Sequence, residues 1–271
     1  MIIWSYIEKL RGNNMQNVLK DVIRYTHDLG EFEAFKVIVD KDGNAKIKSS
    51  SKDLSIIMDA TLKNPIPELY NKTLDEDKKT TVGFSRLNVL AGYVNSPVFN
   101  DETQGNALTV TYKEASGSPD EIRFASDQGH RCTYRFMNPE AVKQKVKTFR
   151  LASGNEVEYD ISFQPSEKFL KDFQSFATIL SKFSNEFSFT IIDGVLYMNL
   201  GDDDTARFPV CETDCESINP MNTWPIKQVL SILKQAPSIE NITFNILDET
   251  SMININIDTD YAVYSFHLSS L

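Results

Sequence analysis

Lysine and hydroxyl side chains form a stripe along one predicted helix in the second half of the chain. Lys168, Lys171, Ser175, Thr178 and Lys182 follow one another at intervals of three or four residues, which places them on one helical face. Such groups contact phosphate oxygens without reading bases, so the stripe suits weak, salt-sensitive and sequence-independent binding of nucleic acid. For any single stripe of this kind, a merely solvated helix face is the commoner explanation.

Two more predicted helices carry the same chemistry. Lys20 and Arg24 lie four residues apart on the first helix, and Lys227 and Lys234 lie seven residues apart on the last. The remaining helix offers little beyond Arg86. Because the chain has a formal net charge of -10, three basic stripes on equivalent helices predict one surface where positive charge is concentrated.

The sequence contains no recognisable catalytic or metal-binding pattern. Its three histidines have no nucleophile or carboxylate pattern around them, and Cys211 and Cys215 lack two further ligands at zinc spacing. Asp202-Asp203-Asp204 directly follows Gly201 between two predicted strands, so a solvated hairpin is favoured over a divalent-metal site. Glycine-rich phosphate-binding motifs are absent. We therefore expect a protein that is not an enzyme and needs no cofactor.

Composition narrows the class of protein further. An apolar share of 41% is enough to build packed cores, and no stretch approaches the roughly 20 apolar residues that span a bilayer. The N-terminal segment has no basic region of the kind that opens a signal peptide. Three cysteines make no disulfide framework. These features predict a cytoplasmic protein without membrane contact, in the host cytoplasm if the protein is viral.

The chain reads as an internal duplication, which sets the architecture. Adding 151 to the positions of the apolar residues Val18, Leu19, Val22 and Leu29 gives Phe169, Leu170, Phe173 and Leu180. The same shift carries Asp42-Gly43 onto Asp193-Gly194. A second correspondence follows in each half, where Phe84 and Trp224 each open an apolar helix and are each followed thirteen residues later by proline, at Pro97 and Pro237.

Each half therefore contains two copies of a strand, a helix and three strands. We expect helices over about 15–29, 85–95, 166–183 and 225–236, with Ser166 as an N-cap and Pro225 at a first helical position. The predicted strands lie near 33–39, 44–49, 54–60, 81–84, 107–113, 120–125, 131–137, 157–163, 187–192, 195–200, 205–211, 241–247, 251–257 and 261–268. Only Ile2–Leu10 could supply the first strand.

The pattern predicts an α+β fold of two tandem domains, with helices on one face of antiparallel sheets. We place the domains at residues 1–140 and 151–271, joined by a connector over 141–150. A proline-containing, charged loop over 64–79 separates the first two repeats.

Three segments in this order resemble a known family. Residues 84–94 (Phe-Ser-Arg-Leu-Asn-Val-Leu-Ala-Gly-Tyr-Val), residues 224–234 (Trp-Pro-Ile-Lys-Gln-Val-Leu-Ser-Ile-Leu-Lys) and the closing stretch 258–271 are similar to segments of DNA polymerase sliding clamps, the processivity factors. The two-domain form resembles the trimeric clamps, and the short helices resemble most those of T-even-type bacteriophages. The resemblance spans nearly the whole chain but rests on pattern and order, and the 64–79 loop makes this chain longer than those phage clamps.

The resemblance implies a homotrimeric ring that encircles double-stranded DNA and slides without reading its sequence. Partners would be a clamp loader and the replicative DNA polymerase, which the ring tethers. Subunits would pair through the edge strands at 130–137 and 205–211. The side chains expected to face DNA in the pore are Lys20, Arg24, Arg86, Lys168, Lys171, Lys182, Lys227 and Lys234.

By the same resemblance, partners insert an apolar peptide into a pocket near the connector and the C-terminal segment. Its candidate residues are Val142, Leu151, Tyr264, Phe266, Leu268 and Leu271. Ordinary core packing is an equally good explanation for the aromatic members, and fraying of the tail is an equally good one for Leu271.

Two readings of another class compete with the clamp. One is a duplicated, non-enzymatic viral structural or assembly protein whose basic stripes are only solvated. The other is an acidic mimic of DNA, which is disfavoured because the carboxylates gather in loops such as 75–77, 202–204 and 212–216 and do not line one face.

Overall fold

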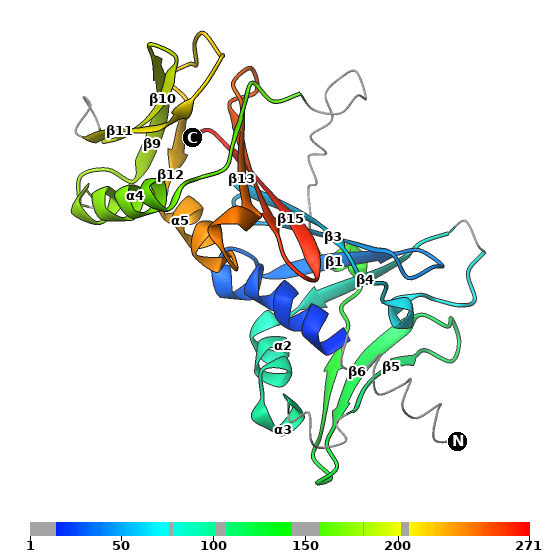
Figure 1. Ribbon diagram of the computed structural model, residues 1–271. Helices are drawn as coiled ribbons and strands as arrows, with labels where there is room; N and C mark the ends of the chain where they lie inside the picture. The colour runs from blue at the N-terminus through cyan, green and yellow to red at the C-terminus, as the bar shows by residue number, and fades with distance from the viewer. Residues whose placement is uncertain (1–14, 76–77, 101–106, 143–157, 181, 202–205) are drawn as a thin grey trace. The chain divides into compact units, whose positions relative to one another are not determined.

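In the computed structural model the chain folds into two compact units, the first built mainly from residues 1–145 and the second mainly from residues 146–271 (Figure 1). The structure describes all residues except 1–14, 76–77, 101–106, 143–157, 181 and 202–205. The predicted first strand within Ile2–Leu10 and most of the predicted connector lie outside the described residues. The domain limits at residues 140 and 150 therefore stay a prediction.

The first unit contains the two repeats expected of it. Its first repeat comprises a helix over residues 15–24, a 3-10 turn η1 (His27–Leu29) and the strands β1 (Ala34–Val39), β2 (Ala45–Ser50) and β3 (Ile56–Leu62). A 3-10 turn η2 (Pro67–Leu69) leads to the second repeat, which comprises β4 (Thr80–Ser85), α2 (Leu87–Val94), α3 (Pro97–Asn100), β5 (Ala107–Tyr112), β6 (Pro119–Ala125) and β7 (Arg131–Arg135). The 3-10 turn η3 (Pro139–Ala141) follows.

The second unit repeats this order with every strand described. Its elements are β8 (Ile161–Phe163), α4 (Glu167–Leu180), β9 (Glu186–Ile192), β10 (Val195–Leu200), β11 (Ala206–Glu212), β12 (Thr223–Pro225), α5 (Ile226–Gln235), η5 (Ile239–Asn241), β13 (Ile242–Leu247), β14 (Met252–Asp258) and β15 (Ala262–Ser269). The predicted α+β architecture of strand-helix-three-strand repeats is confirmed.

The first strand of a repeat completes the sheet of the neighbouring repeat. β4 pairs antiparallel with β1, β12 pairs with β9, and β8 pairs with β13. The resulting strand orders are β4-β1-β2-β3 and β5-β6-β7 in the first unit, and β11-β10-β9-β12 and β15-β14-β13-β8 in the second. In the described part of the chain, both exchanges are present in the second unit and one of them, β4 with β1, in the first.

Local chemistry moves several helix ends from their predicted positions. The first helix ends at residue 24 because the Thr26 hydroxyl donates to the Val22 carbonyl 2.7 Å away and the chain leaves through Gly30 at a φ of 75°. α4 ends at Leu180 and not near 183. The prediction that Pro225 opens a helix was wrong, because Pro225 ends β12 and α5 begins at Ile226.

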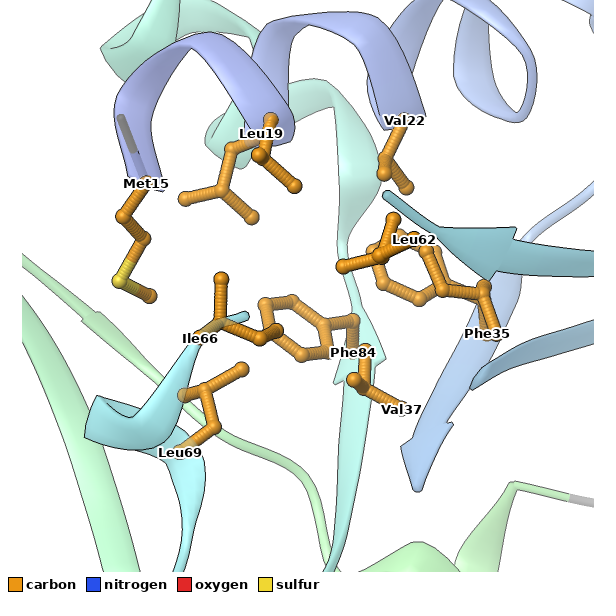
Figure 2. Close-up of a pocket in the computed structure, with 11 residues that line it drawn as sticks. Met15, Leu19, Val22, Phe35, Val37, Leu62, Ile66, Leu69 and Phe84 are labelled. Atoms are coloured by element: carbon orange, nitrogen blue, oxygen red, sulfur yellow. The ribbon is translucent and has the colours of Figure 1, made fainter. Parts of the chain in front are cut away.

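Aromatic residues and the inner side of the first helix form the core of the first unit. Phe84 is fully buried and stacks on Phe35 with ring centroids 4.6 Å apart, while Phe136 meets it edge-on at 5.1 Å. Leu19 and Val22 of the helix line the same cavity as the Phe35 and Phe84 rings, as Figure 2 shows. A cavity of only about 10 Å³ remains there, and its lining is entirely apolar, so it stays dry.

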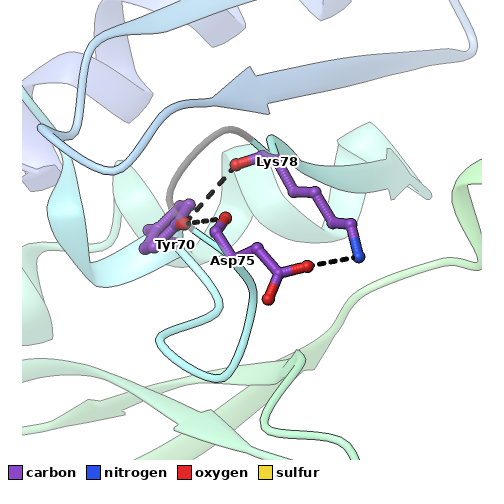
Figure 3. A network of polar contacts seen from close by, with 3 residues as sticks. All are labelled: Tyr70, Asp75 and Lys78. Atoms are coloured by element: carbon purple, nitrogen blue, oxygen red, sulfur yellow. Dashed lines mark hydrogen bonds and ion pairs between the residues drawn. The ribbon is translucent and has the colours of Figure 1, made fainter.

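Residues 70, 71, 75 and 78 of the 64–79 loop make hydrogen bonds and an ion pair within the first unit. Asn71 is buried and its amide donates to the Ser116 carbonyl at 2.9 Å, which ties the loop to the hairpin between β5 and β6. The Tyr70 hydroxyl bonds the carbonyl oxygens of Asp75 and Lys78, whose side chains form an ion pair at 2.7 Å (Figure 3). That pair is solvent-exposed and contributes little, so buried Asn71 is the stronger anchor.

Replacing Phe84 with alanine should lower the free energy of unfolding by about 3–5 kcal/mol, because it leaves a cavity among stacked rings that cannot collapse onto it. Chemical denaturation of the purified protein measures this change. Val98→Ala in α3 is the control, since Val98 is 40% exposed and its loss should change stability by less than about 0.5 kcal/mol. Equal effects of the two substitutions would contradict this account of the core.

Candidate functional site

The cations of the first unit that were expected to face DNA lie on or beside its helices. Arg24 is exposed, with its guanidinium carbon 5.9 Å from the centroid of the Tyr25 ring, while Lys20 is half-buried. Arg86 is exposed at the N-cap of α2, with backbone angles in the left-handed region (φ 50°, ψ 49°). The cation of α2 therefore lies at the N-terminal end of the helix.

α4 carries the predicted lysine stripe in a modified form. The helix starts as expected, because the Ser166 hydroxyl accepts the N–H of Phe169 at 3.1 Å, and Phe169 and Phe173 face the core. Lys168 and Lys171 are both about three-quarters exposed. Lys182 is exposed too, but it lies in the turn beyond the end of the helix.

Carboxylates on α4 partly neutralise the positive charge of its lysines. Lys168 lies 3.9 Å from a carboxylate oxygen of Asp172, and Lys171 lies 3.4 Å from one of Glu167. Exposed ion pairs of this i,i+4 type are weak and exchange with solvent ions. The net positive charge of the stripe is therefore small, which suits transient contact with phosphates better than tight binding.

α5 is the most strongly two-sided helix of the second unit. It buries Ile226, Val229 and Leu233 and leaves Lys227 and Lys234 exposed on the other side. Arg24, Lys168, Lys171, Lys227 and Lys234 are therefore exposed on helices that bury an apolar face, whereas Lys20 is half-buried, Arg86 lies at an N-cap and Lys182 lies beyond the end of α4. That all of them face one pore stays a prediction.

A pocket of about 400 Å³ opens in the first unit where several chain segments converge. The turn between β2 and β3 supplies one wall, and the residues that follow β7 supply another. Its lining residues are Glu33, Ala34, Ser50, Ser51, Lys52, Leu54, Ser85, Met137, Ala141 and Val142. Val142 was named from the sequence as a pocket residue, and it lies here, buried.

Leu54 is the pocket residue with the most unusual backbone. Its φ is 64°, a left-handed conformation that a branched side chain such as leucine rarely adopts, yet its side chain is 37% exposed. The turn is held by the Leu54 N–H, which donates to the Ser51 carbonyl at 3.1 Å, and by the Ser51 hydroxyl, which bonds Asp53 at 2.6 Å. A strained, exposed leucine at a pocket is an observation that motivates a binding role.

Tyr134 forms hydrogen bonds with Ser85, one of the residues that line this pocket. Its hydroxyl donates to the Ser85 carbonyl and accepts the Ser85 N–H at 2.9 Å, and burial raises the pKa of Tyr134 to about 12. The phenol therefore stays protonated at neutral pH and holds the end of β4 rigidly beside the pocket.

The other predicted pocket residues fall elsewhere. Tyr264, Phe266 and Leu268 are fully buried, so they are core residues of the second unit, the alternative that the sequence left open. Leu271 is 65% exposed, and its N–H donates to the Thr223 carbonyl at 3.0 Å, so the tail is held in place. Leu151 lies outside the described residues.

The turn that carries Leu54 was missed at the level of sequence. The strand expected over 54–60 included Leu54 and Ser55, whereas β3 begins at Ile56. The available signal was a single leucine in that turn, out of phase with the alternation of the flanking strands.

β7 and β11 each lie at the edge of a sheet in the described part of the chain. β7 pairs there with β6, and β11 pairs with β10. Both had been named as candidate subunit edges. β11 contains Pro209, a residue that sheets accept at edges because it has no N–H to donate.

Among the described residues, no three His, Cys, Asp or Glu side chains gather closely enough to hold a metal ion. The described helices include none that is both long and apolar enough to cross a membrane.

No protein-family profile matches the sequence, and no curated protein sequence matches it either. Solved structures do match the fold. The complex titled C-terminal region of FEN-1 bound to A. fulgidus PCNA matches with a TM-score of 0.63 and 12% identity, covering 94% of this chain and 96% of that one. PCNA from Thermococcus kodakaraensis matches with a TM-score of 0.63 and 10% identity over 94% and 97% of the two chains.

Proliferating Cellular Nuclear Antigen from Entamoeba histolytica matches with a TM-score of 0.60 and 12% identity over 93% and 96% of the two chains. These proteins are sliding clamps, and each match covers nearly the full length of both chains. At such low identity the similarity is one of fold. The chain has the two-domain sliding-clamp fold.

Proposed function

We propose that this protein is a DNA sliding clamp that closes as a homotrimeric ring around duplex DNA and tethers the replicative polymerase. The observation that carries the proposal is the orientation of the helices, which bury an apolar face and expose lysine or arginine on the other in an otherwise acidic chain. A clamp loader would open the ring on DNA. The resemblance of the short helices to those of T-even-type phage clamps supports a viral origin.

The mechanism follows from weak and repeated contacts. Exposed lysines attract the phosphate backbone electrostatically. Salt screens this attraction, and it does not depend on base sequence. Carboxylates beside Lys168 and Lys171 keep that attraction small. A closed ring stays on the DNA that passes through it, so it needs no tight contact with that DNA. It can slide because each lysine–phosphate contact breaks and re-forms readily.

The pocket beside Leu54 is the proposed docking site for partner peptides. A 400 Å³ hollow with an apolar residue at its mouth accepts one or two apolar anchors of a short segment. The structure titled C-terminal region of FEN-1 bound to A. fulgidus PCNA shows that a protein of this fold binds the C-terminal region of another protein. A tail of the cognate polymerase is the partner that we propose here.

A duplicated viral structural or assembly protein is the second candidate, because its basic helices would need no ligand. Retention on DNA separates the two. A clamp loaded on nicked circular DNA should stay bound after a salt wash and leave when the circle is linearised. A structural protein should show no difference between the two forms of DNA.

Replacing Lys168, Lys171 and Lys182 with alanine should leave stability within about 0.5 kcal/mol, since all three are exposed. Loading on primed DNA should weaken several-fold and its dependence on salt should flatten. Filter binding and polymerase stimulation across a salt series measure both effects. The matched control replaces Lys46, Lys72 and Lys113, three exposed lysines outside the helices. If both triple variants behave alike, the pore assignment is wrong.

Native cysteines offer a test of ring closure. Cys132 lies on β7 and Cys211 on β11, so a bifunctional thiol reagent should link neighbouring subunits into covalent dimers and trimers on a denaturing gel. Partial burial raises the pKa of both thiols, so their reactive thiolate fraction grows with pH and the reaction should run faster under mildly alkaline conditions. Cys132→Ser or Cys211→Ser should abolish the trimer band, whereas Cys215→Ser should not.

Leu54→Asn should separate binding from stability. Asparagine tolerates a positive φ better than leucine, so the free energy of unfolding should stay constant or rise slightly. Affinity for a synthetic peptide of the polymerase's apolar tail should fall about tenfold, or about 1.4 kcal/mol. Isothermal titration measures it, with Val98→Asn as an exposed control outside the pocket. Unchanged affinity would exclude Leu54, and a variant lacking Leu271 tests the tail in the same assay.

A further inference from the structure

Two lysines face each other on the first sheet of the first unit. Lys36 of β1 is the register partner of Lys48 of β2. Side chains opposite each other in an antiparallel pair have Cβ atoms about 4.5–5.5 Å apart, and like charges at such positions destabilise a sheet. Asp59 of β3 lies 3.2 Å from the Lys48 ammonium group and offsets one of the two charges. The pair therefore keeps an excess of positive charge that folding does not favour.

The second unit builds the equivalent sheet without a pair of cations. β9 and β10 are the counterparts of β1 and β2 in the order of the repeats. On the side of this sheet away from Phe189 and Met198, the register pairs of the two strands are uncharged. These pairs are Ser188–Asn199, Thr190–Tyr197 and Ile192–Val195. The Lys36–Lys48 pair is thus particular to the first unit, where the pocket beside Leu54 lies.

The lysine pair adjoins that pocket. Ala34 of β1 and Ser50 of β2 line the pocket, and each lies two residues from one of the lysines. Alternate residues of a strand point to the same face of the sheet and lie about 7 Å apart, since the rise is about 3.3–3.4 Å per residue. Lys36 and Lys48 therefore lie on the same face of the sheet as the pocket, one step farther along the strands.

One wall of the pocket continues beside Lys36. Gly83 of β4 is the register partner of Lys36 on the side of β1 away from β2. A Cβ atom at Gly83 would lie 2.7 Å from the Met137 carbonyl oxygen and 3.1 Å from Cγ2 of Val142. Met137 and Val142 both line the pocket, so this wall rests directly on β4 next to Lys36. A peptide that leaves the pocket along the strands would run beside this wall and over the two lysines.

Carboxylates are the groups that this surface suits best. Lys36 is half-buried and the Lys48 side chain is 29% exposed, so salt screens their attraction to an anion less than it does for the lysines of α4. Lys48 already holds one carboxylate, that of Asp59. Two lysines are too few for a nucleic acid, whose sequence-independent binding depends on many phosphate contacts.

The excess of positive charge ends near the hairpin that joins β1 to β2. Lys46 lies two residues from Lys48, toward this hairpin. The tip of the hairpin carries Lys41, Asp40 and Asp42. The two carboxylates there offset the charges of Lys41 and Lys46. The uncompensated charge therefore lies nearest the pocket.

We infer that the docking site takes a partner segment in which aspartate or glutamate residues flank the apolar anchor, and that Lys36 and Lys48 bind those carboxylates. The inference rests on the proposed docking site and names the chemical class of its partner. An extended chain advances about 3.3–3.6 Å per residue, so carboxylates about two to four residues from an anchor in the pocket would reach the lysines. The anchor would fill the pocket, and the acidic flank would add affinity and select among partners.

The experiment compares two synthetic peptides that share one Leu-Phe anchor and differ only in the flanking residues, which are Asp and Glu in one peptide and Asn and Gln in the other. Fluorescence anisotropy with the full chain at physiological salt should give the acidic peptide an affinity about tenfold higher. K36Q/K48Q should lose that preference and keep its affinity for the neutral peptide. K72Q/K113Q is the matched control and should keep the preference, because both lysines are exposed and lie outside this sheet.

Circular dichroism and thermal melting check the fold of each variant. K36Q keeps the Lys48–Asp59 ion pair, so it replaces the double variant if that one unfolds, and it should lose about threefold of the preference.

Equal affinity of the unsubstituted protein for the two peptides, or an equal loss of preference in K36Q/K48Q and the control, would overturn the inference while leaving the pocket in place. A short DNA duplex that displaces the acidic peptide would assign the lysines to nucleic acid and overturn it too. Failure of both peptides to bind would overturn the docking site together with this inference. The ring itself is tested separately, by retention on circular DNA.

Discussion

The whole architecture depends on one exchange of strands between repeats. A repeat of this chain ends with three strands that lack a neighbour on one side, and the first strand of the other repeat fills that place, as β4 does beside β1 and β12 beside β9. The unpaired backbone groups of an open edge make this exchange favourable, because each added strand satisfies a row of donors and acceptors. A single repeat cannot do this alone. Duplication is therefore a physical requirement of the fold.

The exchange also brings the aromatic cores together. Phe84 arrives on β4 and stacks on Phe35 of β1, and Trp224 arrives on β12 and packs against Phe187 and Phe189. Helices then close over these rings with one apolar side. Lys168, Lys227 and Lys234 lie on the other side of their helices, where they are exposed. The exposure of these lysines follows from the way in which the cores are built.

The pocket beside Leu54 shows how a rigid backbone holds an exposed apolar side chain in place. Leu54 keeps a positive φ because the Ser51 turn on one side and the start of β3 on the other leave it no alternative. Tyr134 fixes the end of β4 through two hydrogen bonds to Ser85. Local strain and exposed apolar atoms persist where the surrounding framework is strong enough to hold them. In this chain they occur at the pocket beside Leu54.

By itself the sequence determined the order and kind of nearly every element. Strand limits such as 195–200 for β10 were predicted without error, because alternation of side chains and the Asp193-Gly194 turn are both local signals. The N-cap at Ser166 and the buried side of α4 were readable for the same reason. Helix ends were predicted less accurately. The hydrogen bond of the Thr26 hydroxyl competes with continuation of the first helix, and strand pairing of Trp224 and Pro225 delays the start of α5.

Only the tertiary structure decided which side chains are covered and which are open. Alternation along β15 shows that Tyr264, Phe266 and Leu268 share a face, but it cannot show that another layer buries that face completely. The turn at Leu54 becomes a pocket only because residues near 34, 85, 137 and 142 converge on it. Ion pairs such as Lys168–Asp172 likewise depend on the rotamers that the two side chains adopt in the folded protein. Pattern is a property of one segment, whereas burial depends on what the rest of the chain places against it.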